Sequence, residues 1–302
     1  MTPSAEGRAY LKMLQETPGF GADGFDLEGL RAGMATRRPP DDSSVVCTDT
    51  EVAGLPAWWV LAEGADPDVR LLYLHGGGFV SGSGAFYLAT AARISKAAKC
   101  AVLLPDYRLA PEHRFPEGLE DCLRAYEGLR TNGPGGPAPA KAVFIGGDSA
   151  GGGLTLSSLL ALRDRGRPLP TGGIALSPFA DMTLSGESIR SEAANEPIMD
   201  PRCLPDFVNR YVDEADLRNP YASPIFGDYT GLPPLLIQVG EHEIIRDDAT
   251  RTAAIAEAAE VDVTLEVWPG MFHVFQSHGP VFPEVCQAAE HMASFMRSCM
   301  RR

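Results

Sequence analysis

Residues 141–153 read Lys-Ala-Val-Phe-Ile-Gly-Gly-Asp-Ser-Ala-Gly-Gly-Gly. An apolar run typical of a β-strand leads into the pattern G-x-S-x-G, made by Gly147, Ser149 and Gly151. A helix-like stretch follows at residues 154–162. A strand, a tight turn and a helix in this order predict a strained elbow that exposes the serine hydroxyl. Glycines on both sides of the serine fit such an elbow, because a side chain there would collide with a neighbouring strand or helix. Ser149 is therefore the predicted nucleophile.

A second glycine-rich segment lies upstream, where His-Gly-Gly-Gly-Phe at residues 75–79 follows the apolar run 69–74. When a serine attacks a carbonyl, the resulting oxyanion needs backbone N–H donors that no side chain obstructs. Gly76 and Gly77 are the predicted donors in this segment, and Ala150, directly after the nucleophile, is the third. On its own this segment would also fit a flexible turn at a strand end.

Length and charge exclude several classes of protein. The chain has 302 residues, is 44% hydrophobic and carries a net charge of −14. This length fits one large α/β domain or two small domains. The negative charge argues against binding to nucleic acids and to anionic membranes. No apolar run approaches the ~18 residues of a membrane span, and the N-terminal residues do not resemble a signal peptide.

The six cysteines show no metal-binding pattern, since no C-x-x-C is present and no histidine lies at zinc-ligand spacing from them. We predict buried free thiols, no metal, and a reducing, cytoplasmic environment. The cysteines are Cys47, Cys100, Cys122, Cys203, Cys286 and Cys299.

Strand-like and helix-like patterns alternate along most of the chain. The strand-like runs are 44–50, 55–62, 69–74, 100–106, 142–146, 173–177, 235–239 and 261–267. The helical patterns are 86–98, 117–129, 149–165, 245–259 and 281–300. This alternation predicts an eight-stranded, mostly parallel sheet with helices on both faces. The first two runs are joined near Gly54 and should form a hairpin. Residues 132–139, rich in proline and glycine, are predicted to be a loop.

Two segments interrupt this alternation and are predicted to form one helical cap. Residues 1–40 carry helical patterns and no strand, and residues 182–222 separate the sixth and seventh strands by irregular helix. Long insertions between core elements commonly build lids and binding surfaces. The catalytic domain would then comprise residues 41–181 and 223–302. The aromatic residues of the cap could line an apolar pocket or form the cap's own core; they are Phe20, Phe25, Phe207 and Tyr211.

A serine hydroxyl needs a histidine to accept its proton and a carboxylate to orient that histidine. Around an elbow of this kind the acid and then the histidine should follow the serine in the chain. Four histidines lie in segments with other assignments: His75, His113, His242 and His291. His273 and His278 remain. We predict His273 as the base, because it directly follows the last strand, where a loop can reach the elbow.

Three carboxylates after the seventh strand compete for the role of the acid: Glu241, Glu243 and Asp247. A carboxylate just past this strand would face His273. Each could instead be a solvated charge at a helix N-terminus. Glu243 is preferred, because it lies nearest the expected position and leaves room for a helix to begin near Ile244. Asp247 is the main alternative.

Four motifs together resemble the hormone-sensitive-lipase family of α/β-hydrolases, and most closely its bacterial carboxylesterases. They are residues 75–79, the stretch Asp-Tyr-Arg-Leu-Ala-Pro-Glu-His at 106–113, Gly-Asp-Ser-Ala-Gly-Gly at 147–152, and Met-Phe-His-Val-Phe at 271–275. The resemblance extends from about residue 44 to the C-terminus. It implies a capped α/β-hydrolase fold, with residues 106–113 as a structural segment.

The resemblance also implies roles for single residues. Ser149 would be the nucleophile and His273 the base, with an oxyanion hole from Gly76, Gly77 and Ala150. The family commonly has Asp-Pro-Leu at the acid position and a second acidic residue four positions later. This chain departs from that pattern, and counting back from its Asp247, the second acid, places Glu243 at the acid position.

The expected activity is hydrolysis of small carboxylic esters without a cofactor. The serine would form an acyl-enzyme, which water then hydrolyses to release the carboxylic acid. The resemblance adds short acyl chains and a homodimer through the last strand and helix. Two alternatives remain open at this point. The chain could be a non-catalytic small-molecule receptor, as in plant gibberellin receptors of the same fold, or an amidase or lactonase. The presence of His273 favours catalysis over the receptor.

Overall fold

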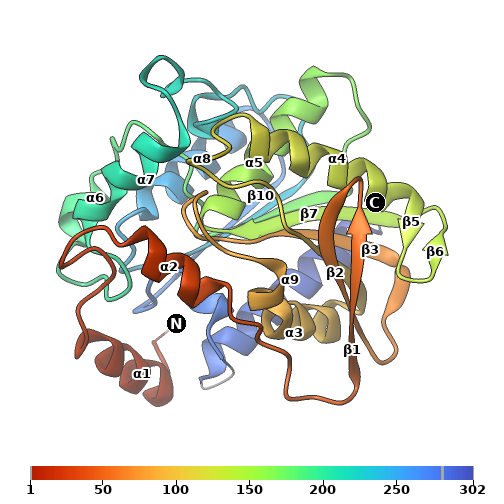
Figure 1. The fold of residues 1–302 in the computed structure, drawn as a ribbon, viewed down its shortest axis with the longest axis horizontal. Helices are drawn as coiled ribbons and strands as arrows, with labels where there is room; N and C mark the ends of the chain where they lie inside the picture. The colour runs from red at the N-terminus through yellow and green to blue at the C-terminus, as the bar shows by residue number, and fades with distance from the viewer. Residues whose placement is uncertain (1, 280–281, 302) are drawn as a thin grey trace.

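The structure, a computed structural model, describes residues 2–279 and 282–301. Within these residues an eight-stranded sheet has the order β1-β2-β4-β3-β7-β8-β9-β10 (Figure 1). The strands are β1 (Val45–Val52), β2 (Leu55–Ala62), β3 (Asp66–Leu74), β4 (Cys100–Pro105), β7 (Ala142–Asp148), β8 (Gly172–Leu176), β9 (Leu235–Gly240) and β10 (Val263–Trp268). The prediction of an eight-stranded, mostly parallel sheet is confirmed, with most strand ends shifted by one to three residues.

Among the described strands of this sheet, only the β2 pairings are antiparallel, to β1 and to β4, and the other neighbours run parallel. The predicted hairpin between β1 and β2 forms through Ala53 and Gly54, both at positive φ (51° and 81°). Strand β3 lies beside β7, with Leu74 opposite Gly147. The glycine-rich segment after β3 and the elbow after β7 therefore emerge side by side from the same edge of the sheet.

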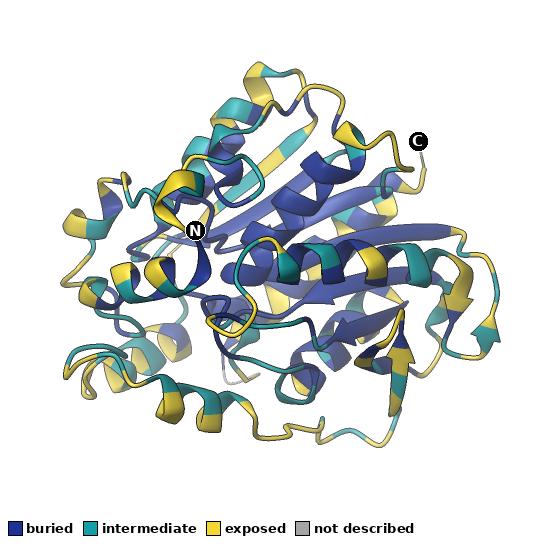
Figure 2. Cartoon of the chain, turned by 45° about the horizontal axis from the view of Figure 1, so that its top comes forward, coloured by how far each residue is buried: buried dark blue, intermediate teal, exposed yellow. Residues whose placement is uncertain are grey.

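Helices cover both faces of the sheet (Figure 1). One face carries α3 (Leu88–Ala98) and α9 (Pro283–Cys299), and the other carries α4 (Glu117–Thr131), α5 (Ala150–Asp164) and α8 (Arg246–Ala258). Side chains alternate between the two faces along β3, as in any strand. Leu71 and Tyr73 join the core under α3 and α9. Leu72 and Leu74 join the core under α4 and α5. Figure 2 shows the central strands buried and more exposed residues along the edge.

Two predictions about single segments need adjustment. Residues 132–139 are not only a loop, because β5 (Asn132–Gly133) and β6 (Gly136–Pro137) pair as a small hairpin. Gly136 has a φ of 109°, which a residue with a side chain rarely adopts. The predicted helix 281–300 is found as α9, and its first predicted residue, Val281, lies outside the described residues. Short 3₁₀ helices occur at Gly84–Tyr87, Pro201–Cys203, Glu214–Asp216, Pro224–Phe226 and Phe275–Ser277.

The segments 1–40 and 182–222 lie next to each other in space. They carry α1 (Ala5–Gln15), α2 (Leu27–Met34), α6 (Ser188–Ser191) and α7 (Leu204–Tyr211), which gather at the left of Figure 1. The Phe20 N–H donates to the Ile198 carbonyl (2.8 Å), and the Asp200 N–H donates to the Phe20 carbonyl (2.8 Å). Two chain segments some 180 positions apart thus share backbone hydrogen bonds.

The predicted aromatic residues take two different positions. Phe20, Phe25 and Phe207 pack on one another, with ring centroids 4.8–5.8 Å apart. Tyr211 instead stacks on Phe79 of the glycine-rich segment, with ring centroids 3.8 Å apart. The segment 182–222 therefore reaches the sheet edge through Tyr211.

No disulfide joins the cysteines, all of which lie among the described residues. Four side chains are buried as predicted: Cys100, Cys122, Cys203 and Cys299. The prediction is wrong for Cys286, which is exposed on α9, and Cys47 is only partly buried. In the described part of the chain, no helix combines the length and the apolar character needed to cross a membrane.

Candidate active site

The turn between β7 and α5 has the geometry of the predicted elbow. Ser149 has φ 53° and ψ −119°, a conformation that residues with side chains rarely adopt. The flanking glycines are required by close approach of β3. A Cβ on either Gly147 or Gly151 would overlap the Leu74 carbonyl oxygen. The elbow is therefore held by backbone contact with the neighbouring strand, which explains why both positions of the motif are glycine.

His273 lies between the serine and a carboxylate. Its Nε2 is 2.9 Å from Ser149 Oγ, and its Nδ1 is 2.9 Å from Glu243 Oε2. The other Glu243 oxygen accepts hydrogen bonds from Ser177 Oγ (2.6 Å) and the Gly240 N–H (2.5 Å). The glutamate is fully buried, so these contacts fix its position. The structure brings together the three residues that the sequence proposed for nucleophile, base and acid.

The surroundings of His273 favour its protonated form. Burial by itself lowers the pKa of His273, but the hydrogen bond and negative charge of Glu243 outweigh it, with help from Glu196 and Asp148. The pKa of His273 is consequently raised above its ordinary value. This environment would stabilise a positive charge on the imidazole, as the predicted role of His273 as base requires.

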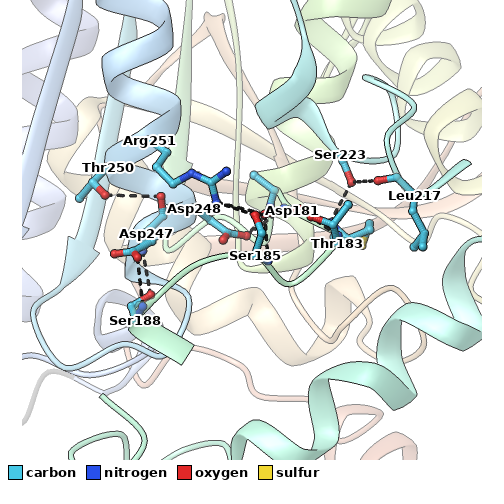
Figure 3. Close-up of polar contacts among 12 residues, drawn as sticks. Asp181, Thr183, Ser185, Ser188, Leu217, Ser223, Asp247, Asp248, Thr250 and Arg251 are labelled. Carbon is cyan, nitrogen blue, oxygen red and sulfur yellow. Dashed lines mark hydrogen bonds and ion pairs between the residues drawn. The ribbon is translucent and has the colours of Figure 1, made fainter. Parts of the chain in front are cut away.

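The two competing carboxylates point elsewhere. Asp247 Oδ2 accepts the Ser188 N–H (3.0 Å), and Figure 3 shows its side chain directed at Ser188. Glu241 accepts the Gly270 N–H (2.8 Å). Neither contacts His273. Asp247 instead fastens α6 to the start of α8.

The glycine-rich segment differs from the prediction in one residue. Gly77 lines the cavity in front of Ser149 together with Gly78, whereas Gly76 does not. The Gly76 N–H donates to Tyr87 Oη (3.2 Å), so this predicted donor is already engaged. Among the described residues, neither the Gly77 nor the Gly78 N–H has a hydrogen-bond partner. Both residues have positive φ (118° and 63°), which turns the chain toward the cavity.

A buried carboxylate joins the elbow to the glycine-rich segment. Asp148, within the elbow motif, accepts hydrogen bonds from Tyr73 Oη (2.9 Å) and Tyr87 Oη (2.8 Å). Burial raises the pKa of Asp148 to about 6, and the two hydroxyls partly oppose this shift. Tyr87 Oη also accepts the Gly76 N–H, so this one side chain connects the elbow to the glycine-rich segment. Sequence reasoning missed this contact, since no local pattern links Tyr87 to Asp148.

A second buried acid, also missed, contacts the histidine from the segment 182–222. Glu196 accepts the His273 N–H (3.2 Å) through one oxygen and the Ile198 N–H (2.9 Å) through the other. Burial raises the pKa of Glu196 to about 8, with the charge of His273 opposing and that of Glu243 adding to the shift. The segment is thereby tied to the backbone of the predicted base. No spacing in the sequence identifies a contact between positions 77 residues apart.

The serine opens into one cavity of about 210 Å³ with mostly apolar walls. The part of the wall that comes from residues 1–40 and 182–222 is formed by Phe20, Leu30, Met34, Ile198, Met199, Leu204 and Phe207. A more open neighbouring groove of about 460 Å³ shares Phe20, Leu30, Met34 and Phe86 with it. Among the described residues, no group of three or more His, Cys, Asp or Glu side chains could hold a metal ion. Small apolar ligands fit such a cavity.

Comparison with known proteins gives one consistent result. Residues 71–277 match the alpha/beta hydrolase fold family. The chain is 43% identical over 228 residues to an acetyl-hydrolase of Streptomyces hygroscopicus, covering 76% of this chain and 75% of that protein. A crystal structure of an esterase from the bacterial hormone-sensitive lipase family has a TM-score of 0.87 at 39% identity, covering 99% and 100% of the two chains. A crystal structure of EstE5 soaked with p-nitrophenyl butyrate has a TM-score of 0.90 at 37% identity, with the same coverage.

The fold and these relatives define the class of protein: the chain is a carboxylic ester hydrolase with an α/β-hydrolase sheet. It belongs to the alpha/beta hydrolase fold family, and its structural neighbours are esterases of the bacterial hormone-sensitive-lipase group. The family resemblance seen in the four sequence motifs is thereby confirmed.

Proposed function

We propose that the chain hydrolyses short-chain carboxylic esters through an acyl-enzyme on Ser149, with His273 as base and Glu243 as orienting acid. The observation that carries this proposal is the position of the imidazole, 2.9 Å from both the serine oxygen and the carboxylate. Both distances are within the range for proton transfer and for orientation of a catalytic histidine.

The reaction has two halves. In the first, Ser149 Oγ attacks the ester carbonyl while His273 Nε2 takes the serine proton, and the tetrahedral intermediate expels the alcohol, which receives that proton from His273. In the second, His273 takes a proton from water, the hydroxide attacks the acyl carbon, and the acid leaves as Ser149 regains its proton. Glu243 keeps Nδ1 protonated and stabilises the positive charge on the ring.

The proposed oxyanion hole consists of the N–H groups of Gly77, Gly78 and Ala150. The two glycine amides lack partners among the described residues. Ala150 begins α5, and the first N–H groups of a helix have no acceptor within it. Such donors are each worth about 3–4 kcal/mol of transition-state stabilisation. Gly78 takes the place of Gly76 in this proposal, because the Gly76 N–H donates to Tyr87 Oη.

Short substrates are proposed from the size of the cavity and from two relatives. At about 210 Å³ the cavity lies below the range of roughly 300–1,000 Å³ that is typical of ligand pockets. One relative is described as an acetyl-hydrolase, and the structure of the neighbour EstE5 was obtained after a soak with p-nitrophenyl butyrate. Acyl groups of about this length are the ones we expect this chain to accept.

We further propose that residues 1–40 and 182–222 act together as a cap over the carboxyl ends of the strands, with the remaining residues as the catalytic domain. The backbone hydrogen bonds between Phe20 and residues 198–200 support joint movement of the two segments.

A homodimer through β10 and α9 also remains a proposal. It is supported by the position of β10 at the sheet edge and by the exposed Val267 there, and light scattering of the purified chain tests it.

The test of the central proposal is hydrolysis of p-nitrophenyl acetate and butyrate by the wild type and Ser149→Ala. We expect the variant to lose at least about 10⁴-fold in kcat, because the serine acts as a unit with its base. Equal rates in the two proteins would remove the assignment of Ser149. A matched control is Ser157→Ala, a buried serine on α5 outside the cavity, which should keep its activity.

A further inference from the structure

A second imidazole, His278, lines the cavity that contains Ser149. It follows the 3₁₀ helix at Phe275–Ser277, only five positions after His273. Its ring packs edge-on against Phe272 (5.0 Å between centroids) and against Tyr10 of α1 (5.5 Å). The ring is thus fixed between two aromatic side chains, although the proposed reaction gives it no task.

The contact with α1 favours one position for the ring proton of His278. His278 Nδ1 lies 2.9 Å from Tyr10 Oη. Burial raises the pKa of Tyr10, so the phenol keeps its proton. Among the described residues, Nδ1 is the acceptor placed within reach of that proton, and we infer that the phenol donates to it. A neutral His278 that accepts at Nδ1 must carry its own proton on Nε2.

The surroundings of His278 keep the ring neutral. Burial lowers the pKa of His278 to about 4, and the positive charges of His273, Arg38 and Arg93 add to this shift. At neutral pH the ring consequently has a single N–H, on Nε2. In the described part of the chain, Nε2 of His278 has no hydrogen-bond partner. It is also not fully buried. A donor remains open beside the apolar walls of the cavity.

We propose that His278 is a specificity-determining residue whose Nε2–H donates a hydrogen bond to an oxygen atom of the ester substrate other than those of the scissile ester group. The enzyme would then prefer esters that carry a carbonyl or ether oxygen in the acyl or alcohol part over alkyl esters of equal size. A purely alkyl ester displaces water from this donor and leaves it unsatisfied, which is unfavourable. The inference rests on the proposed chemistry at Ser149, because it assumes that substrates occupy this cavity.

The test compares pairs of esters with equal numbers of non-hydrogen atoms. Methyl 4-oxopentanoate is paired with methyl 4-methylpentanoate for the acyl part, and 2-methoxyethyl acetate with butyl acetate for the alcohol part. The quantity measured is the ratio of kcat/KM within each pair, in the wild type and in His278→Phe. We expect this ratio to fall about tenfold in the variant for at least one pair, as is reasonable for the loss of one hydrogen bond to the substrate.

Two further variants separate this role from a purely structural one. His278→Gln keeps an N–H near the position of Nε2 and should recover part of the preference. Tyr10→Phe leaves His278 in place but removes the phenol that fixes its tautomer. The preference for esters with an additional oxygen should then weaken, without loss of hydrolysis of p-nitrophenyl acetate. His291→Gln, on α9 outside the cavity, is the matched control and should leave every ratio unchanged.

The outcomes distinguish this inference from the function on which it depends. Unchanged ratios in both His278→Phe and Tyr10→Phe, with hydrolysis retained, would contradict the role of His278 and leave Ser149 unaffected. Nitrogen-15 NMR of the ring gives a readout that needs no activity: a proton on Nδ1 would overturn the inference, and a proton on Nε2 would support it. Retained hydrolysis in Ser149→Ala would instead contradict the proposed function.

Discussion

The elbow at Ser149 and the cavity wall opposite it are built in different ways. The elbow is made within a few residues, and backbone contacts with β3 leave no space for a Cβ on its glycines. The wall is made by segments some 180 residues apart, which meet through side chains such as Phe20 and Phe207. Chemistry therefore depends on backbone geometry that tolerates little change, whereas the shape of the cavity depends on side chains that can be exchanged. Each of the following predictions tests one side of this difference or a contact between the two.

The largest effect is expected from Glu243→Ala. Loss of the carboxylate frees His273 to adopt the wrong tautomer and removes the charge that stabilises the imidazolium, so kcat should fall by about 10³–10⁴-fold. Steady-state kinetics with p-nitrophenyl butyrate measures this. A fall of tenfold or less would exclude Glu243 as the orienting acid.

A smaller effect is expected where the two regions touch. A Cβ on Gly78 would overlap the ring of Phe207. Gly78→Ala should therefore displace the proposed oxyanion donor and lower kcat by about 10²-fold, the lower end of the loss seen when one donor is removed. The double variant Gly78→Ala/Phe207→Ala should regain part of this loss, because the clash is with a side chain, whereas the φ of 63° strains any residue with a Cβ at this position. If the double variant is no better than Gly78→Ala, the loss does not come from Phe207.

Glu196 links the wall to His273, the proposed base, and its effect should appear in the dependence of stability on pH. The pKa of Glu196 is about 8 in the folded chain against an ordinary value of 4.5, because burial disfavours the charged form. Between these values the folded state holds a proton that the unfolded state has lost. Its contribution to stability is therefore present below pH 4.5 and is lost as the pH rises toward 8. The expected slope is at most ~1.4 kcal/mol per pH unit.

Glu196→Gln should remove this part of the slope, since glutamine does not titrate. Denaturant unfolding at pH 5 and pH 8 measures the difference, and the wild type should lose more stability than the variant over this range. Asp148 and Asp248 also have raised pKa values, about 6 and about 8, and they contribute equally to both proteins. Identical pH dependence in the two proteins would show that Glu196 is charged in the folded chain.

The smallest effect is expected from Asp247→Ala. This side chain holds the Ser188 N–H and has no contact with His273. Its removal should lower the free energy of unfolding by about 1 kcal/mol and leave kcat within twofold of the wild type. The same kinetic assay and a urea titration check both values. A large fall in kcat would transfer the role of the acid from Glu243 to Asp247.

The same difference explains what could be predicted from the sequence. The number of strands, their mostly parallel arrangement and the place of Ser149 follow from local patterns, and His273 and Glu243 follow from their position just after strands. The register of the glycine-rich turn could not be predicted. It depends on the hydroxyl of Tyr87, which occupies the Gly76 N–H and leaves Gly78 facing the cavity. A contact of that kind is decided by tertiary packing.

The contacts of Glu196 and Tyr10 with the histidine segment were missed for the same reason. Each joins residues far apart in the chain, one 77 and the other 268 positions away from its partner. Neither residue lies in a motif. Glutamate is rarely buried, so the residue type itself argues against placing Glu196 beside the cavity. Only a structure can place such residues beside the cavity.

The central claim, that Ser149 is activated by His273, is tested most directly by covalent labelling. A small organophosphate is incubated with the wild type, Ser149→Ala and His273→Ala, and the labelled peptide is located by mass spectrometry. We predict one label per chain of the wild type, on Ser149, no label on Ser149→Ala, and labelling of His273→Ala slowed by several orders of magnitude. Rapid labelling of Ser149 in the absence of His273, or a label on another residue that accompanies loss of activity, would contradict it.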